Sequence, residues 1–200
     1  MDIRLAMYEN IAKDLRESLC VHQTMFENSP LQEQMVKLSQ WCLDALRQGG
    51  KIIFAGNGGS FADSQHLAAE FVSRLRFDRK PLPSVALSTN SSCMSAIAND
   101  YGYDQVFSRE LRALAAPKDV FIPITTSGNS PNILAAVAVA KELGVSTMGF
   151  TGENGGKLAT LCPCLRVPSM RTERIQEGHI LLGHILCALV ERAYFDWGAS

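Results

Sequence analysis

Short apolar runs recur along this chain, and most of them end in a loop or turn that leads toward a helical segment, while the fourth leads through a glycine-rich turn to the fifth. The runs cover residues 51–55, 84–87, 120–124, 146–150 and 165–168. They are nearly continuous in apolar side chains, as expected of strands that are buried on both faces. Strands that alternate with helices form a parallel sheet covered on both sides. We therefore predict an α/β fold with a parallel sheet between two layers of helices.

Helical spacing of apolar residues fills the segments around these strands. Residues 5–48 fit two amphipathic helices that are broken near Asn28-Ser29-Pro30 and end at Gly49-Gly50, because glycine adopts the left-handed conformation of a helix C-cap. Further helices are predicted at 61–75, 93–99, 131–143 and 175–195. Two hundred residues suffice for one full-sized core, so we expect a single domain over residues 1–200.

The overall charge and hydropathy disfavour two classes of partner. Nineteen basic and 20 acidic residues give a formal net charge of -1, so no overall field attracts the chain to nucleic acid or to an anionic membrane. No apolar run reaches the length of a membrane span, and the first residues lack the apolar core of a signal peptide. We expect a protein that binds neither nucleic acid nor membranes.

The six cysteines lack the spacing of a zinc motif or of a disulfide framework. Reduced thiols and a cytoplasmic location are the simplest interpretation. Only Cys162 and Cys164 are close in sequence, with Pro163 between them. We interpret residues 162–168 as a strand with both sulfurs on one face, and metal binding at this pair is disfavoured.

Two polar loops follow the predicted strands 51–55 and 120–124. In an open parallel sheet, ligands bind beyond the carboxyl ends of the strands. The second loop surrounds Gly128 with hydroxyl groups at the start of a helix, where free N–H groups and the helix dipole favour a phosphate. These hydroxyls belong to Thr125, Thr126, Ser127 and Ser130. Such residues are also ordinary turn and N-cap residues, but two such loops at one sheet edge favour a phosphate site.

The first polar loop does not have a nucleotide-binding pattern. Its glycines are Gly56, Gly58 and Gly59, which do not match G-x-G-x-x-G, and the Gly-Lys-Ser of a P-loop is missing. Nucleotide binding is therefore disfavoured.

Side chains that bind metals occur on two predicted helices. His66 and Glu70 stand at i and i+4, so they project from one helix face. Gln176 and His184 share broadly one side of the last helix, and the role of His179 is ambiguous. Imidazole, carboxylate and amide oxygen suit zinc or a similar divalent ion. Spacing alone cannot join the two helices, and a single histidine on an apolar helix face is usually a packed core residue.

Six strings in the chain resemble bacterial phosphoheptose isomerases (sedoheptulose 7-phosphate isomerases), which are members of the sugar isomerase (SIS) domain superfamily. The strings are AGNGGS at 55–60, QH at 65–66, AEFVSR at 69–74, ANDYGY at 98–103, TSGNS at 126–130 and RIQEGH at 174–179. The resemblance covers nearly the whole chain. It implies a three-layer SIS fold with a five-stranded parallel sheet and extra N-terminal helices. It also implies a homotetramer with sites between subunits, in which residues 1–48 take part in oligomer contacts.

The resemblance further implies an activity: the interconversion of D-sedoheptulose 7-phosphate and D-glycero-D-manno-heptose 7-phosphate through an enediol(ate). This step begins heptose synthesis for lipopolysaccharide or capsule. Two other readings stay open. Some similar SIS proteins are non-catalytic and bind the bacterial replication initiator protein as tetramers, although they lack parts of the acid/base set. Related SIS enzymes that act on hexosamine or arabinose phosphates typically have longer chains.

The resemblance also assigns roles to particular residues. It implies a zinc ion held by His66, Glu70, Gln176 and His184. The implied substrate contacts are Asn57, Gly58, Gly59, Ser60, Glu70, Asn99, Asp100, Thr125, Thr126, Ser127, Ser130 and Gln176. Glu70 is expected to move the carbon-bound proton and His184 to serve the oxygens as acid and base. Metal binding lowers the basicity of a carboxylate, which leaves open whether Glu70 is chiefly ligand or base.

Two positions differ from the usual pattern of that family. Asn90 stands where close relatives commonly have aspartate, and Thr125 stands where serine is usual. The first difference affects the expected contacts to sugar hydroxyls, while the second keeps a hydroxyl donor.

Overall fold

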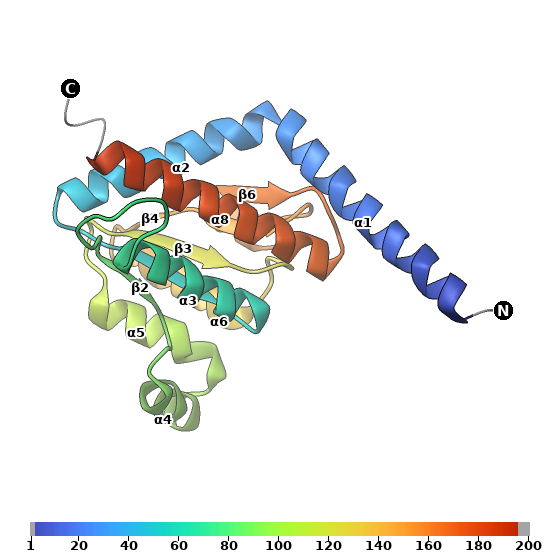
Figure 1. Ribbon diagram of the computed structural model, residues 1–200. Coiled ribbons are helices and arrows are strands. Elements are labelled where there is room, and N and C mark those ends of the chain that lie inside the picture. The colour runs from blue at the N-terminus through green and yellow to red at the C-terminus, as the bar shows by residue number, and fades with distance from the viewer. Residues whose placement is uncertain (1–2, 196–200) are drawn as a thin grey trace.

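A parallel sheet forms the centre of the protein in a computed structural model that describes residues 3–195 (Figure 1). Its strands follow the order β2-β1-β3-β5-β6, and β4 also pairs with β3. The strands are β1 (Ile52–Gly56), β2 (Ser84–Ala86), β3 (Val120–Ile124), β4 (Ser146–Thr147), β5 (Gly149–Gly152) and β6 (Cys164–Val167). The predicted parallel sheet is confirmed, with one difference. The run at 146–150 forms two short strands, β4 beside the start of β3 and β5 beside its end.

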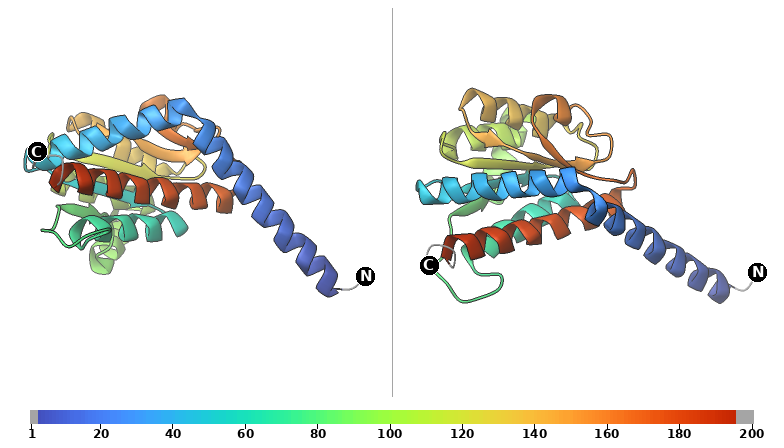
Figure 2. Two further views of the ribbon diagram at one scale, coloured as in Figure 1. Left: turned by 45° about the horizontal axis from the view of Figure 1, so that its top comes forward. Right: turned by 90° about the horizontal axis from the view of Figure 1, so that it is seen from above.

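Helices cover both faces of this sheet (Figure 2). They are α1 (Ile3–Glu27), α2 (Ser29–Arg47), α3 (Gly59–Val72), α4 (Ser91–Tyr101), α5 (Val106–Leu114), α6 (Pro131–Glu142), α7 (Leu158–Leu161) and α8 (Thr172–Phe195). Alternate residues of β1 enter two separate cores, as the pleat of a strand requires. Ile52 and Phe54 pack with α2, α3 and α8, whereas Ile53 and Ala55 pack with α5 and α6. These layers make the three-layer α/β sandwich.

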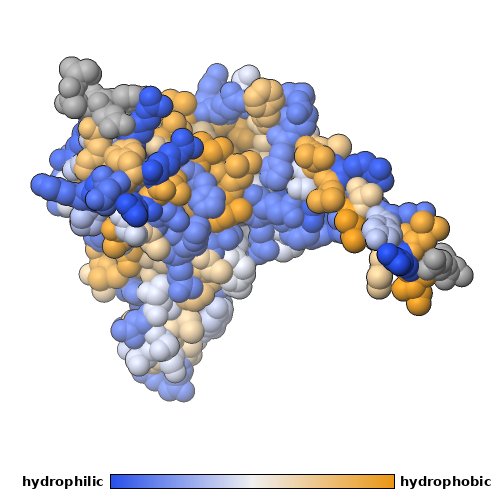
Figure 3. All heavy atoms as spheres, in the orientation of Figure 1, coloured by the Kyte–Doolittle hydropathy of each residue, from blue (hydrophilic) through white to orange (hydrophobic). Residues whose placement is uncertain are grey.

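Helix α1 projects away from the sheet (Figures 1 and 2). Among its residues only Val21 and Met25 are buried. A stripe of exposed apolar side chains follows its length, which Figure 3 shows on the projecting helix. The stripe consists of Met7, Ile11, Leu15 and Leu19, each between 57% and 68% exposed. No described helix is long and apolar enough to cross a membrane.

Polar contacts join the middle of α1 to the beginning of α8. The Ser18 hydroxyl donates to the Glu177 carboxylate at 2.9 Å, and Arg174 donates to the Asp14 carbonyl at 3.0 Å. Arg171 also lies against the Asp14 and Glu17 carboxylates. Exposed ion pairs of this kind contribute little stability one by one. They nevertheless fix the direction in which α1 leaves the rest of the protein.

Two helices lie where none is predicted from the sequence. Helix α5 follows a short 3-10 turn (Tyr103–Gln105), and α7 is a single turn within the glycine-rich segment before β6. Helix α3 also begins two residues earlier than predicted, at Gly59, and ends at Val72. The earlier start matters for the site because it places the first polar loop directly at the N-terminus of α3.

Candidate active site

The second polar loop, residues 125–130, crosses from β3 to α6 at the carboxyl edge of the sheet. Its hydroxyls are held by short-range contacts. Thr125 is buried, and its Oγ1 lies 3.0 Å from the Ser130 Oγ, while the backbone N–H of Asn129 donates to the Ser127 Oγ at 3.1 Å. Gly128 has a φ of +66° and lies so close to the Gly155 carbonyl that no side chain fits there. The loop is therefore shaped by its own residues together with the glycine-rich segment that follows β5.

A pocket of about 280 Å³ opens beside this loop. It lies between the loop, the segment after β5 and the beginning of α8. Its lining is Thr126, Ser127, Asn129, Gly152, Glu153, Asn154, Gly155, Gly156, Ser169, Met170, Thr172 and Ile175. Hydroxyls and backbone groups near the N-terminus of α6 make this pocket suited to a phosphate.

The first polar loop is tied through a pair of amides to the first turn of α6, which directly follows the second loop. Asn57 and Asn132 exchange two hydrogen bonds of 2.9 Å, and the Tyr103 hydroxyl donates to the Asn57 Oδ1 at 3.1 Å. Asn132 is buried at the start of α6. Ser60, predicted to bind substrate, is also buried. Neither Asn132 nor Tyr103 was predicted as a site residue, because an asparagine after a helix-starting proline looks like an ordinary turn residue.

Three of the four predicted metal ligands come together between α3 and α8. The Nε2 atoms of His66 and His184 are 2.8 Å apart, and the His66 Nε2 lies 3.4 Å from the Glu70 Oε1. One ligand atom from each of the three residues lies within 4.8 Å of the others. Two imidazoles and a carboxylate at such separations fit a zinc ion, whose bonds to nitrogen and oxygen are about 2.0–2.2 Å long. The contact between the two helices, which spacing alone could not establish, is thus present.

The fourth predicted ligand, Gln176, belongs to α8, and its side chain lies against the beginning of α3. Its side-chain amide packs against Gly59 so closely that a Cβ at position 59 would collide with it. Gln176 therefore connects the first polar loop with α8. This contact also explains why residue 59 is glycine.

Asp63 is a further acidic residue near the cluster that was not predicted. Its Oδ2 is buried and has no hydrogen-bond partner among the described residues. Burial raises the pKa of the Asp63 carboxyl, while His66 and His184 act in the opposite direction. A position three residues before His66 could have suggested its proximity, because i and i+3 share a helix face.

A buried ion pair fixes the two helices that carry the cluster. The Glu191 carboxylate on α8 accepts hydrogen bonds from the backbone N–H groups of Leu75 and Arg76 and from the Arg79 guanidinium, at 2.9–3.0 Å. Arg79 also donates to the carbonyls of Glu70 and Phe71 at the end of α3. Both side chains are 1–2% exposed. The pair thus joins the C-terminus of α3 to α8.

Three other residues of interest lie apart from this cluster. Asn99 and Asp100 are exposed on α4, where they line a separate pocket with Ser91, Ser92 and Ser95. Their contact with substrate stays a prediction. His179 is fully buried beside the Phe150 ring, and burial lowers its pKa to about 4. A neutral histidine packed in this way is typical of a core residue with a structural role.

Comparisons with known proteins agree with this arrangement. The model of the SIS domain family matches residues 21–152. A phosphoheptose isomerase of Aneurinibacillus thermoaerophilus is 48% identical over 94% of this chain and 96% of its own. A phosphoheptose isomerase of Burkholderia pseudomallei is 50% identical over 92% of this chain and 94% of its own length. The solved phosphoheptose isomerase of Neisseria gonorrhoeae is 41% identical, with a TM-score of 0.87 over 92% of this chain and 98% of that one. The chain belongs to the SIS domain family and, within it, to the phosphoheptose isomerases.

Proposed function

We propose that this protein interconverts D-sedoheptulose 7-phosphate and D-glycero-D-manno-heptose 7-phosphate in the cytoplasm, as the first step of heptose synthesis for lipopolysaccharide or capsule. The observation that carries the proposal is the cluster of His66, Glu70 and His184 between α3 and α8, on a fold with two polar loops at its sheet edge. Relatives about 50% identical over more than nine-tenths of the chain are phosphoheptose isomerases, which supports the choice of a seven-carbon substrate.

The reaction requires a proton to leave one carbon of the sugar and to return to its neighbour. We assign this transfer to Glu70, because a carboxylate positioned within the cluster can take up a carbon-bound proton and return it. His184 exchanges protons with the two sugar oxygens. The loop at residues 125–130 holds the phosphate, so that the reacting carbons lie at a fixed distance from both groups.

The cluster is also suited to a divalent metal, and we propose zinc. His66, Glu70 and His184 would hold it, with Gln176 as the fourth ligand. When bound, such an ion acts as a Lewis acid that stabilises negative charge on the sugar oxygens. Glu70 then has two roles in one site, and a carboxylate shared with a metal loses some basicity.

We further propose that the working form is a homotetramer with sites at subunit interfaces. The apolar stripe on α1 supports this proposal, since exposed apolar surface of this extent marks an interaction site. The exposed Asn99 and Asp100 on α4 suit a site completed between subunits.

The decisive experiment is to incubate the purified protein with sedoheptulose 7-phosphate and follow the aldose product by NMR. We expect the product to form, to disappear after treatment with a chelator and to return when zinc is added. Absence of aldose from the zinc-loaded protein would overturn the proposed function. Binding of the replication initiator protein by an inactive tetramer would then favour the non-catalytic alternative.

A further inference from the structure

One turn of the backbone, at the carboxyl end of β2, has an unusual conformation. Ser88, in the loop between β2 and α4, has a φ of +63° and is the only residue other than glycine with a positive φ within residues 3–195. A Cβ disfavours this left-handed conformation, which glycine adopts far more readily. Strain of this kind persists only where the surroundings hold it in place, and it is common at functional sites. The contacts of Ser88 therefore show what holds this turn.

Two groups of α5 hold the strained turn. Ser88 is 2% exposed, and its backbone N–H donates to the Glu110 carboxylate. Its hydroxyl donates to the Val106 carbonyl at 3.3 Å. Without Glu110 the Ser88 N–H would be buried and unpaired, which destabilises the conformation that points it there. Glu110 thus stabilises the left-handed conformation of Ser88.

Helix α4 depends on this turn for its direction. None of its residues is buried, and Figure 1 shows it at the lower end of the molecule, beyond α5. Its apolar side chains are only partly buried against the neighbouring core. Asn90 caps the helix through a hydrogen bond of 3.1 Å from a backbone N–H of the first turn. Since only Thr89 separates Ser88 from this cap, the conformation of Ser88 determines the direction in which α4 starts.

Helix α5 also holds the other end of α4. The Arg109 guanidinium carbon lies 3.6 Å from the centre of the Tyr101 ring, which is a cation–π contact. Arg109 and Glu110 are neighbours on α5, so one place on this helix contacts both ends of α4. Helix α5 itself is anchored by Phe107 and Leu111, which are buried in the core. The position of α4 is therefore set by the core through α5.

The residues that α4 carries make its position important. Asn99 and Asp100, both predicted to bind substrate, belong to its last turn, and the Asn99 amide donates to the Asp100 carboxylate at 2.8 Å. The segment after the helix reaches the first polar loop, because the Tyr103 hydroxyl donates to the Asn57 Oδ1. A change of direction at Ser88 would move Asn99 and Asp100 relative to that loop.

We propose that Glu110 is a positioning residue of the substrate site: by holding Ser88 in the left-handed conformation, it sets the direction of α4 and hence the places of Asn99 and Asp100. This inference rests on the proposed function, which gives Asn99 and Asp100 their roles. Glu110 acts through the backbone and does not touch the substrate. Its loss should therefore weaken substrate binding and leave the chemical step at the His66 cluster unchanged.

Three variants of the full, zinc-loaded chain test the proposal in steady-state kinetics with sedoheptulose 7-phosphate. Glu110→Ala should raise KM about tenfold and keep kcat within about twofold. Glu110→Gln, whose amide oxygen still accepts from the Ser88 N–H, should keep KM within about twofold of the unsubstituted protein. Adding Ser88→Gly to Glu110→Ala should recover much of the loss, because glycine adopts the left-handed conformation without support.

Hydrogen exchange gives a readout that does not depend on turnover. The backbone amides of residues 88–101 should exchange about tenfold faster in Glu110→Ala than in the unsubstituted protein, because this segment opens more readily. In Glu110→Gln they should exchange at the unsubstituted rate. Exchange over residues 125–130 should be the same in all variants, because that loop has its own hydrogen bonds.

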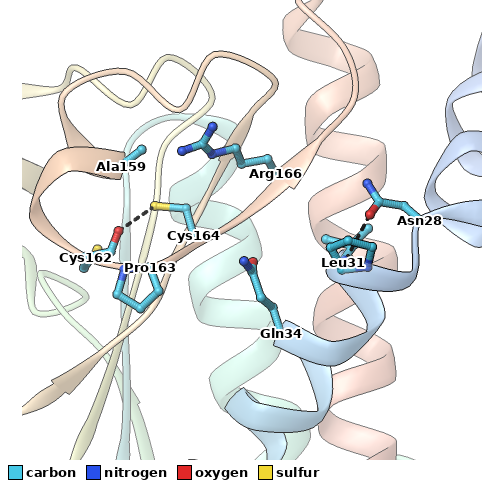
Figure 4. Close-up of a pocket in the computed structure, with 9 residues that line it drawn as sticks. Asn28, Leu31, Gln34, Ala159, Cys162, Pro163, Cys164 and Arg166 are labelled. Atoms are coloured by element: carbon cyan, nitrogen blue, oxygen red, sulfur yellow. Dashed lines mark hydrogen bonds between the residues drawn. The ribbon is translucent and has the colours of Figure 1, made fainter.

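Gln34→Ala is the matched control. Gln34 is half-buried, as Glu110 is, but it lines a cavity of about 320 Å³ between α2, α7 and β6, together with Cys162, Cys164 and Arg166 (Figure 4). Strands β6 and β2 lie at opposite edges of the sheet, so this cavity is far from the turn that follows β2. Truncation of Gln34 should change neither KM nor the exchange of residues 88–101.

An unchanged KM in Glu110→Ala would overturn the proposal, even with faster exchange of residues 88–101. A KM raised equally in Glu110→Ala and Glu110→Gln, or an equal effect of Gln34→Ala, would also overturn it. If the unsubstituted protein shows no turnover, the proposed function fails by itself. Equal exchange of residues 88–101 in the unsubstituted protein and in Glu110→Ala would then contradict the role of Glu110 as well, whereas faster exchange would support it.

Discussion

The second polar loop and the His66 cluster are assembled in opposite ways. Within residues 125–130, hydrogen bonds join side chains that are two to five positions apart, as between Thr125 and Ser130. In the cluster, His66 and His184 are separated by 118 positions. The loop is further held by the segment after β5, where the backbone N–H groups of Gly152 and Leu158 donate to the carbonyls of Thr126 and Gly128, so it does not rely on the contact between α3 and α8. The cluster depends on how α3 and α8 are fixed, so the two regions should respond differently to the same mutations.

The largest expected effect separates chemistry from phosphate binding. Glu70→Gln or His184→Gln should lower kcat about 10⁴-fold, at the upper end of what positioned acid/base groups contribute. The thermal stabilisation by inorganic phosphate should be unchanged, because the loop at 125–130 is intact. Both are measured on the same preparation, by NMR assay and by thermal unfolding. Turnover close to that of the unsubstituted protein in either variant would contradict the assigned role.

The buried ion pair should matter for the cluster and not for the loop. Removing one partner, as in Glu191→Leu or Arg79→Met, leaves a buried charge and should cost about 3–5 kcal/mol of unfolding free energy. The affinity for zinc should fall about 10- to 100-fold, as for lost supporting contacts around a metal. Denaturant unfolding and competition with a chromogenic chelator measure the two effects.

The double variant Arg79→Met/Glu191→Leu is the matched control for that experiment. It removes both charges, so the unfolding free energy should recover in part. Zinc affinity should stay low, because the end of α3 is still not joined to α8. Full recovery of zinc affinity in the double variant would show that the pair does not position the ligands.

The packing of α8 against the sheet should make the free energy of unfolding sensitive to acid. His179 is buried with a pKa of about 4 in the folded protein, against 6.5 for the unfolded reference. The unfolded chain therefore binds more protons between these values, and stability falls as the pH drops from 6.5 to 4. The loss should reach about 3 kcal/mol and should be absent in His179→Gln. Unfolding at a series of pH values in both proteins tests this, and parallel curves would refute it.

Substitution of Asn132 should weaken substrate binding, because its amide positions the first polar loop next to the second. Asn132→Ala leaves the Asn57 amide without its partner and should raise KM about tenfold, which corresponds to about 1.4 kcal/mol. Asn132→Asp keeps the shape and still accepts from the Asn57 amide, so its effect on KM should be smaller. Steady-state kinetics of the two variants measure the difference. An unchanged KM in Asn132→Ala would mean that the amide pair is not needed for binding.

The smallest effect is expected from a single loop hydroxyl. Ser130→Ala removes the partner of the Thr125 hydroxyl and should weaken phosphate binding by about 1 kcal/mol, roughly fivefold in Kd. Zinc affinity should stay the same. Calorimetric titration with inorganic phosphate and the chelator competition test both statements, and a parallel loss of zinc affinity would show that the two regions are coupled after all.

The features that are predictable from the sequence are those with a local cause. Strand β1 is buried on both faces and bounded by glycines, so its apolar run identifies it. The turn at Gly49 has φ +73°, as a glycine C-cap predicts. Helix α7 is missed because it is a single turn next to glycines, where no helical period can be detected. Helix α5 has a local signal that was overlooked, since Phe107, Leu111 and Leu114 recur at helical spacing.

The contacts that complete the site have no local cause. The His66–His184 approach and the Arg79–Glu191 pair join positions more than 100 residues apart, and no spacing rule links them. Only the family resemblance placed His66 and His184 in one site from the sequence. Arg79 and Glu191 were not predicted at all, because each looks like an ordinary surface charge until α3 and α8 are packed together.

The long separation within the cluster also sets an order of events during synthesis. At about 5–20 residues per second, roughly 6–24 s pass between translation of His66 and of His184, which are 118 positions apart. Strand β1 and α3 leave the ribosome long before α8, so the growing chain offers only His66 and Glu70 from this cluster. The last helix also brings Glu191, which joins the end of α3 to α8. Capture of a metal ion by the full set of ligands is therefore confined to the finished chain, after the polar loops have already been made.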